Sequence, residues 1–333
     1  MREFYRRHRG LHRWLLAVVA LLAVYFALRP VPGLMNWLSR HVIMPWERAV
    51  ASVCYLFRTS MAEVAYIVLL SVAIFYVANV LRRLVTQPHR GRTLYRFFLT
   101  VVCSGLSIYA GFCLLWGVNY YADSFQQQSG IYARSCTVEE LEAVTADFAR
   151  QLAQAADNVQ RDENGCFAVS RQDIFAAATS VYAPSYEEFP CLRMKDHTPK
   201  AISCSTALSA MDFTGFYFPF TGEANLNVDC PASFLPSTIV HEMAHQRGIA
   251  SEQECNFLAV LASTTSGDPV YEYSGWLMGY IHLGNALYQA DPAAWQAIRD
   301  SLPDTVLADL ASNNAYWASF EGAAADASQK VYD

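Results

Sequence analysis

Charged residues are scarce in this 333-residue chain, and they are unevenly distributed. They make up 16% of the sequence, against about 25% in typical globular domains, whereas hydrophobic residues make up 53%. Residues 1–118 contain 14 Lys or Arg and 3 Asp or Glu, a balance of +11, and residues 119–333 contain 10 and 27, a balance of −17. This composition excludes an ordinary soluble enzyme, and the acidic part disfavours nucleic acid as a partner.

Cysteine pairs with metal-site spacing are also lacking. None of the 9 cysteines forms a CxxC motif, so a cysteine zinc site is not expected. Six of the cysteines follow residue 121, and the sequence does not decide whether or how they pair.

Long runs without charge lie at residues 14–28, 64–81 and 97–118. We interpret them as three membrane-spanning helices in an anchor over residues 1–121, which makes the lipid bilayer a partner. The first run is short and follows five arginines, which is also typical of a signal peptide. Because Arg29-Pro30-Val31-Pro32 follows it, and not a small-residue cleavage site, we favour an uncleaved span.

The arginines predict how the anchor is oriented. They cluster before the first run and between the second and third runs, whereas the segment after the third run begins acidic. By the positive-inside rule, the N-terminus is expected in the cytoplasm and residues 122–333 outside it.

The stretch HEMAHQRG, residues 241–248, predicts a metal site. Residues four apart share a helix face, so His241 and His245 can ligate one Zn²⁺ ion, and Glu242 can act as the general base on a water. Pro236-Ser237-Thr238 indicates a capped helix start before the motif. A triplet of this kind arises by chance in roughly one chain in a hundred, so the context has to support it.

A third ligand is expected from a second helix that begins at Ser251. Glu254 shares a face with Phe257, Leu258 and Leu261, an apolar stripe that would pack on the motif helix, whereas Glu252 does not. A carboxylate on a buried face needs a partner, which zinc would supply. The alternative is that Ser251 and Glu254 form a capping box. A metzincin is disfavoured because Ser251 stands where that class has a third histidine.

The acidic part is predicted to be a mainly α-helical (α+β) zincin-like domain. Thr137 indicates the start of a helix that runs to about Val159, and residues 215–229 have the pattern of a β-hairpin that turns at Thr221-Gly222. Tyr273 and His282 are candidate oxyanion-stabilising groups, although core or rim positions are commoner for these residue types.

The chain resembles a bacterial membrane family catalogued as domain of unknown function 3810, whose members look like gluzincin-type zinc peptidases. The resemblance rests on Trp116-Gly117 with Asn119-Tyr120, on residues 215–227, on HEMAHQRG and on residues 254–257, and it covers nearly the whole chain. It implies that His241, His245 and Glu254 are ligands and that Glu242 is the base. Family members often continue past the Lys330–Asp333 ending, so a last helix is expected to be missing here.

We therefore expect a bacterial multi-pass membrane zinc metalloendopeptidase that acts on a peptide or protein substrate. The alternative is a catalytically inactive sensor or scaffold, in which the same ligands hold two helices together and no substrate reaches the metal.

Overall fold

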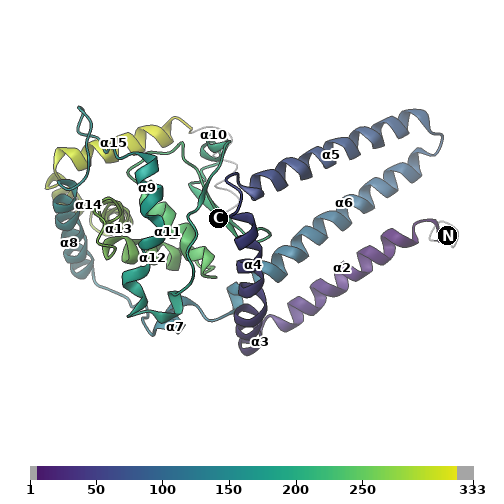
Figure 1. Ribbon diagram of the computed structural model, residues 1–333, viewed down its shortest axis with the longest axis horizontal. Helices are drawn as coiled ribbons and strands as arrows, with labels where there is room; N and C mark the ends of the chain where they lie inside the picture. The colour runs from purple at the N-terminus through teal and green to yellow at the C-terminus, as the bar shows by residue number, and fades with distance from the viewer. Residues whose placement is uncertain (1–5, 321–333) are drawn as a thin grey trace. The chain divides into compact units, whose positions relative to one another are not determined.

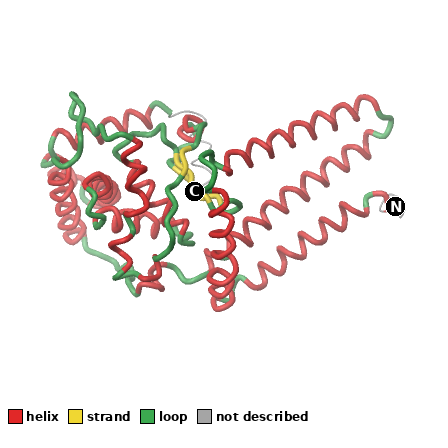
Figure 2. Tube along the Cα trace, in the orientation of Figure 1, coloured by secondary structure: helices red, strands yellow, loops and turns green. Residues whose placement is uncertain are grey.

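The structure is a computed structural model that describes residues 6–320. It is mostly helical, with one small three-stranded sheet (Figures 1 and 2). The chain forms two compact units. Unit 1 comprises the described part of Met1–Asp123 together with Phe218–Glu223, and unit 2 comprises Ser124–Tyr217 and the described part of Ala224–Asp333. The ending at Lys330–Asp333 lies outside the described residues.

Unit 1 is helical apart from the tip of a hairpin. Its helices are α2 (Arg9–Leu28), α3 (Pro32–Leu38), the π-helix η1 (Ser39–Ile43), α4 (Met44–Cys54), α5 (Met61–Thr86), α6 (Arg90–Phe112), the π-helix η2 (Cys113–Gly117) and the 3₁₀-helix η3 (Asn119–Tyr121). Three stretches are long and apolar enough to cross a membrane: α2, α5, and α6 with η2. The three predicted helices are therefore present and could cross a membrane, and each begins before its apolar run.

The three long helices of unit 1 lie side by side, with α2 parallel to α6 and α5 antiparallel to it (Figure 1). Near the N-terminal ends of α2 and α6, His12 Nε2 lies 2.7 Å from the Tyr95 hydroxyl. Further along, the Trp14 indole donates to Ser107 Oγ at 2.9 Å. The N-terminus of α2 is therefore at the same end of the bundle as the α5–α6 connection.

The hairpin tip belongs to unit 1 because its residues pack on the helices there. Glu223 is fully buried, and its carboxylate accepts from the backbone N–H groups of Met61 and Ala62 at 3.2 and 2.9 Å, which caps α5. Gly222 turns with a φ of +65°, and a Cβ there would lie 2.6 Å from the Glu47 carbonyl oxygen. Only glycine meets both requirements.

Unit 2 contains the remaining elements, and its long helix α13 packs against α8, α11, α12 and α14. The helices are α7 (Phe125–Ser129), α8 (Val138–Ala156), α9 (Arg171–Ala177), η4 (Ala178–Ser180), η5 (Ala183–Tyr186), η6 (Pro190–Leu192), α10 (Ser205–Ser209), α11 (Leu235–Gln246), α12 (Glu252–Thr264), α13 (Pro269–Ala290), α14 (Pro292–Asp300) and α15 (Asp304–Ala318). Thr137 caps α8 in a capping box with Glu140, as predicted.

The sheet is mixed and small, with strands β1 (Lys200–Ala201), β2 (Gly215–Phe218) and β3 (Glu223–Leu226) in the order β1-β3-β2. β1 runs parallel to β3, with Lys200 opposite Asn225. The predicted hairpin is present, but all four residues of β3 are buried. Apolar and polar residues alternate in β3, which is the pattern of a half-exposed strand, but its polar side chains are covered as well.

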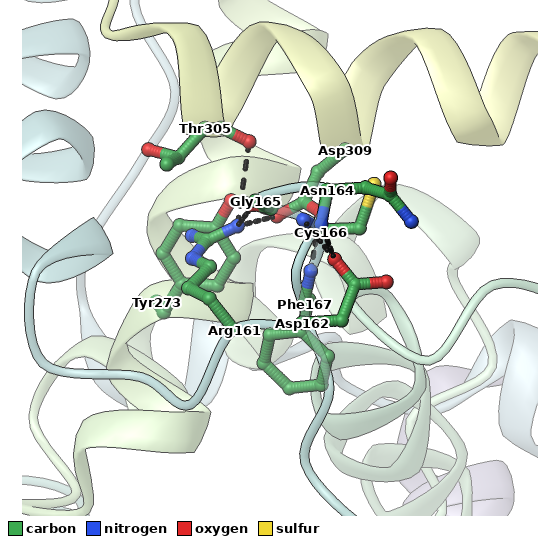
Figure 3. A network of polar contacts seen from close by, with 9 residues as sticks. All are labelled: Arg161, Asp162, Asn164, Gly165, Cys166, Phe167, Tyr273, Thr305 and Asp309. Carbon is green, nitrogen blue, oxygen red and sulfur yellow. Dashed lines mark hydrogen bonds and ion pairs between the residues drawn. The ribbon is translucent and has the colours of Figure 1, made fainter.

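A buried ion pair joins three segments of unit 2 (Figure 3). Asp309 of α15 is 2% exposed, and its Oδ2 accepts from Arg161 Nη1 at 2.6 Å and from the Tyr273 hydroxyl. Its Oδ1 accepts from the Phe167 backbone N–H at 2.8 Å. The Arg161 guanidinium also lies 4.8 Å from the centre of the Tyr273 ring. One carboxylate thus holds the 161–167 loop and helix α13 to α15.

We expect Asp309→Asn to lower the free energy of unfolding by about 3–5 kcal/mol, because it leaves the Arg161 charge buried without a counterion. Asp304→Asn is the matched control on the same helix, since Asp304 is exposed at the helix start and its loss should cost under about 1 kcal/mol. Thermal unfolding of the purified full chain, followed by tryptophan fluorescence, measures both. Equal effects of the two variants would contradict the role given to Asp309.

Candidate metal centre

Helix α11 carries the two histidines of the motif on one face. The rings of His241 and His245, one turn apart, have centroids 5.0 Å apart. The helix ends at Gln246, and Gly248 then adopts a φ of +83° and donates its N–H to the His245 carbonyl. The predicted side-chain cap at its start is absent: Phe234 is the N-cap residue, and Pro236 occupies the first turn.

Nδ1 of each imidazole contacts an oxygen atom of a residue that follows α11 in the sequence. His245 Nδ1 lies 2.8 Å from the Ile249 carbonyl oxygen, and His241 Nδ1 lies 2.8 Å from Asn256 Oδ1. A carbonyl oxygen can only accept, so Nδ1 of each ring carries the proton. In a neutral ring, Nε2 is then the nitrogen with a lone pair, which is the arrangement found in histidine ligands of metals.

Glu252, the first residue of α12, faces both Nε2 atoms. Its Oε2 lies 3.1 Å from His241 Nε2, and its Oε1 lies 3.6 Å from His245 Nε2. Hydrogen bonds from the two histidines hold the pKa of Glu252 far below its usual range. Burial disfavours the charged form of His245, but contacts with Cys255 and Glu252 outweigh burial and raise its pKa well above the usual value. The side chain of Glu252 is 71% exposed, so this side of the cluster opens to solvent.

Glu254, the ligand predicted from the sequence, is directed elsewhere. Its Oε2 accepts from the Phe125 N–H at 2.9 Å, and its Oε1 accepts from the Gln126 N–H at 3.0 Å. Both oxygens therefore serve the first turn of α7. Of the two hydrogen bonds of a capping box, the structure has the one in which Ser251 Oγ accepts from the Glu254 N–H.

The apolar stripe that pointed to Glu254 also differs from the prediction. Phe257 is 46% exposed, and the buried face of α12 is formed by Cys255, Leu258, Ala259 and Ala262. The face that packs in the core is thus turned slightly from the predicted one. The carboxylate of Glu254 is buried in contact with α7.

Glu242 is buried beside the histidines. It is 3% exposed, and its Oε2 has no hydrogen-bond partner among residues 6–320. Burial raises the pKa of its carboxyl group, although the two histidines act in the opposite direction. Gly215 of β2 makes room for this side chain, because a Cβ there would lie 2.6 Å from Glu242 Oε1. A buried oxygen without a hydrogen-bond partner costs free energy of folding. Such oxygens in native proteins are often found in groups that have a functional role.

Cys255 offers a second set of ligand atoms, because His241, His245 and Cys255 also come within 4.8 Å of one another. Its Sγ, however, lies 3.4 Å from His245 Nδ1 and 3.5 Å from the Ile249 carbonyl oxygen. The thiol is therefore on the side of the ring whose nitrogen already donates to Ile249. The set of His241, His245 and Glu252 has its donor atoms on the correct side and is the better fit.

The geometry of that set can be compared with a zinc site. Ligand atoms about 2.0–2.1 Å from Zn²⁺ in a tetrahedron lie about 3.3 Å from one another. The two contacts between imidazole nitrogen and carboxylate oxygen, 3.1 and 3.6 Å, lie on either side of that value. Two imidazoles and one carboxylate are also ligands that suit zinc. By its chemistry, this set of donors suits a zinc ion.

A buried arginine anchors the end of the motif helix. Arg247 Nη1 donates to the Met243 carbonyl, and Nη2 forms an ion pair with Asp196. Its guanidinium carbon also lies 3.5 Å from the centre of the Tyr182 ring. These contacts attach the last turn of α11, which carries His245, to the segment around residue 196.

Tyr273, a candidate oxyanion-stabilising group, and the neighbouring Tyr271 are engaged in the core. The Tyr273 hydroxyl donates to Asp309, and that of Tyr271 donates to the Ile174 carbonyl. His282 is exposed, and desolvation together with the charge of His241 lowers its pKa. Of these three, His282 alone remains available to a substrate.

Sequence reasoning missed Asn256 as the group that orients His241. A signal was present, since Asn256 follows Glu252 by four residues and therefore shares its helix face. The role of the Ile249 carbonyl had no such signal, because every residue has a carbonyl.

Comparisons with known proteins agree with the resemblance noted in the sequence. A search of curated proteins and a search of solved structures each returned no match. A family model described as "Protein of unknown function (DUF3810)" matches residues 39–333, which is most of the chain. The chain therefore belongs to the DUF3810 family.

Proposed function

We propose that this chain is a membrane-anchored zinc metallopeptidase, with His241, His245 and Glu252 as metal ligands and Glu242 as general base. The observation that carries the proposal is the convergence of both Nε2 atoms on one carboxylate, beside a buried glutamate with an unpartnered oxygen. When bound, zinc supplies a Lewis acid that polarises a carbonyl group and lowers the pKa of a water.

Glu242 provides the acid–base chemistry in this proposal. Its carboxylate takes a proton from the water that attacks the peptide carbonyl, and the resulting carboxylic acid then delivers the proton to the leaving amine. Burial raises the pKa of Glu242, which makes it a stronger base than an exposed glutamate. His282 is the candidate donor to the oxyanion.

The substrate in this proposal is an extended peptide. β2 is the last strand in the sheet order, and its residue Gly215 lies against Glu242. A peptide that pairs with the edge of β2 would have its backbone held by hydrogen bonds next to the general base.

The alternative function is a zinc-stabilised sensor or scaffold. Such a protein needs the three ligands but gains nothing from a buried carboxylate oxygen without a partner, which costs free energy. The exposed Glu252 also supports a site that solvent and substrate reach, whereas structural zinc sites are closed. Both features favour the peptidase.

We further propose that the chain resides in a bacterial cell membrane with its N-terminus in the cytoplasm and unit 2 outside. The support is the arginine distribution along the chain, together with three helices able to cross a membrane. An odd number of spans puts the two ends of the anchor on opposite sides.

The ligand assignment predicts different results for two neighbouring glutamates. Glu252→Ala should weaken zinc binding at least about tenfold, whereas Glu254→Ala should keep the affinity and instead destabilise the protein, because two N–H groups of α7 lose their acceptor. Competition with a chromophoric zinc chelator gives the affinity, and thermal unfolding gives the stability. Zinc loss in Glu254→Ala alone would return the ligand role to Glu254.

The general-base assignment predicts that Glu242→Gln lowers peptide hydrolysis by about 10²–10⁴-fold with zinc retained. The isosteric change keeps the packing against Gly215 but removes the proton acceptor. Cleavage of a quenched-fluorescent random peptide mixture by the zinc-loaded full chain measures the effect. If wild type and variant are equally inactive while both bind zinc, the scaffold function replaces the peptidase.

The proposed orientation predicts labelling of Cys136, which is exposed in unit 2, by a membrane-impermeant maleimide in intact spheroplasts. The control is Gln87→Cys, in the connection between α5 and α6, which should react only after the membrane is permeabilised. Mass spectrometry of the labelled peptides identifies each site. The opposite pattern would invert the orientation.

A further inference from the structure

One end of the helix bundle in unit 1 is strongly basic. The N-terminal parts of α2 and α6 and the C-terminal part of α5 meet there (Figure 1). Together they carry nine arginines, which we call the arginine end: Arg6, Arg7, Arg9, Arg13, Arg82, Arg83, Arg90, Arg92 and Arg96. No Asp or Glu occurs in residues 6–20 or 79–99. Within these described stretches, no acidic side chain balances the positive charge.

The arginines of this end are open to solvent. Eight of them are exposed, and Arg83 is half-buried. Among the described residues none of the nine forms an ion pair, and Arg82 donates only to Asn79. Guanidinium groups in this state are available to an external anion, and their planar forks suit phosphate oxygens.

Three of these arginines act electrostatically on one buried histidine ring. His8 is 4% exposed, and its ring packs edge-on against Tyr95 of α6 at 5.2 Å. Desolvation and the positive charges of Arg96, His12, Arg7 and Arg92 lower the pKa of His8, which places Arg7 of the N-terminal segment and two arginines of α6 around the same ring. Mutual repulsion of these charges would be relieved by an anion bound between them.

The neighbouring surface indicates which anion. Large apolar side chains stand exposed within a few residues of the arginines, including Leu16 at 64%, Val85 at 80% and Phe98 at 67%. A phospholipid offers both a phosphate for the arginines and acyl chains for these side chains. A soluble polyanion such as nucleic acid offers only the first.

We propose that the arginine end is a binding site for anionic phospholipid head groups, with Arg7, Arg92 and Arg96 holding a phosphate. The lipid fixes the depth and tilt of the anchor in the leaflet that faces this end. The inference rests on the membrane location proposed above and is independent of the metal centre.

Native mass spectrometry of the full chain in detergent micelles tests the proposal, with titrated phosphatidylglycerol or phosphatidylcholine. Phosphatidylglycerol should bind at least about fivefold more tightly. Replacing Arg7, Arg92 and Arg96 with Gln should weaken its binding by more than about tenfold, since each arginine near an anionic surface contributes about fivefold. Inorganic phosphate at millimolar concentration should displace little of the lipid, because it lacks the acyl chains.

Two further variants keep the test falsifiable. Arg40, Arg48 and Arg58 are exposed in the segment that contains α3 and α4, and replacing all three with Gln removes the same charge while phosphatidylglycerol binding should stay within about twofold. The Lys version of the Arg7, Arg92 and Arg96 variant retains charge and should recover part of the binding. Equal binding of the two lipids, or equal losses in the two triple Gln variants, would overturn the proposal.

Discussion

Two hydrogen bonds on the Nδ1 side of the imidazoles are the interaction on which the metal centre depends. The Ile249 carbonyl and the Asn256 amide oxygen each bind one ring; Ile249 lies in the connection between α11 and α12, and Asn256 lies near the start of α12. A neutral imidazole has one N–H, so holding it at Nδ1 leaves the lone pair of Nε2, on the side where Glu252 lies, for a metal ion. The turn at Gly248 and the start of α12 therefore contribute as much to the site as the motif helix.

Four of the buried carboxylates, Glu223, Glu242, Glu254 and Asp309, differ in how their oxygens are bound. Glu223, Glu254 and Asp309 each accept from at least two groups, and each joins segments that are distant in the sequence. Glu242 differs, because one of its oxygens has no partner within the described residues. A buried carboxylate with satisfied oxygens stabilises a fold, whereas an unsatisfied one has free energy to gain from a proton or a substrate.

Much of the fold was predictable where the interactions are local. Apolar runs predicted the three long helices, and the side chains of Thr137 and Ser251 cap α8 and α12 as their positions indicate. These features depend on residues within about four positions of one another. The burial of both faces of β3 was not predictable, because it depends on distant segments that cover its polar side chains.

The sequence by itself determined that His241, Glu242 and His245 share one region of a helix, because the period of the helix requires it. It also determined the three apolar spans and the basic end of the bundle, which follow from composition. Only the tertiary structure distinguishes the surroundings of the two glutamates. The N–H groups that bind Glu254 belong to α7, 129 residues away along the chain for Phe125, and no local pattern reports such a partner. With Glu254 engaged there, Glu252 at the start of α12 is the carboxylate that faces the imidazoles.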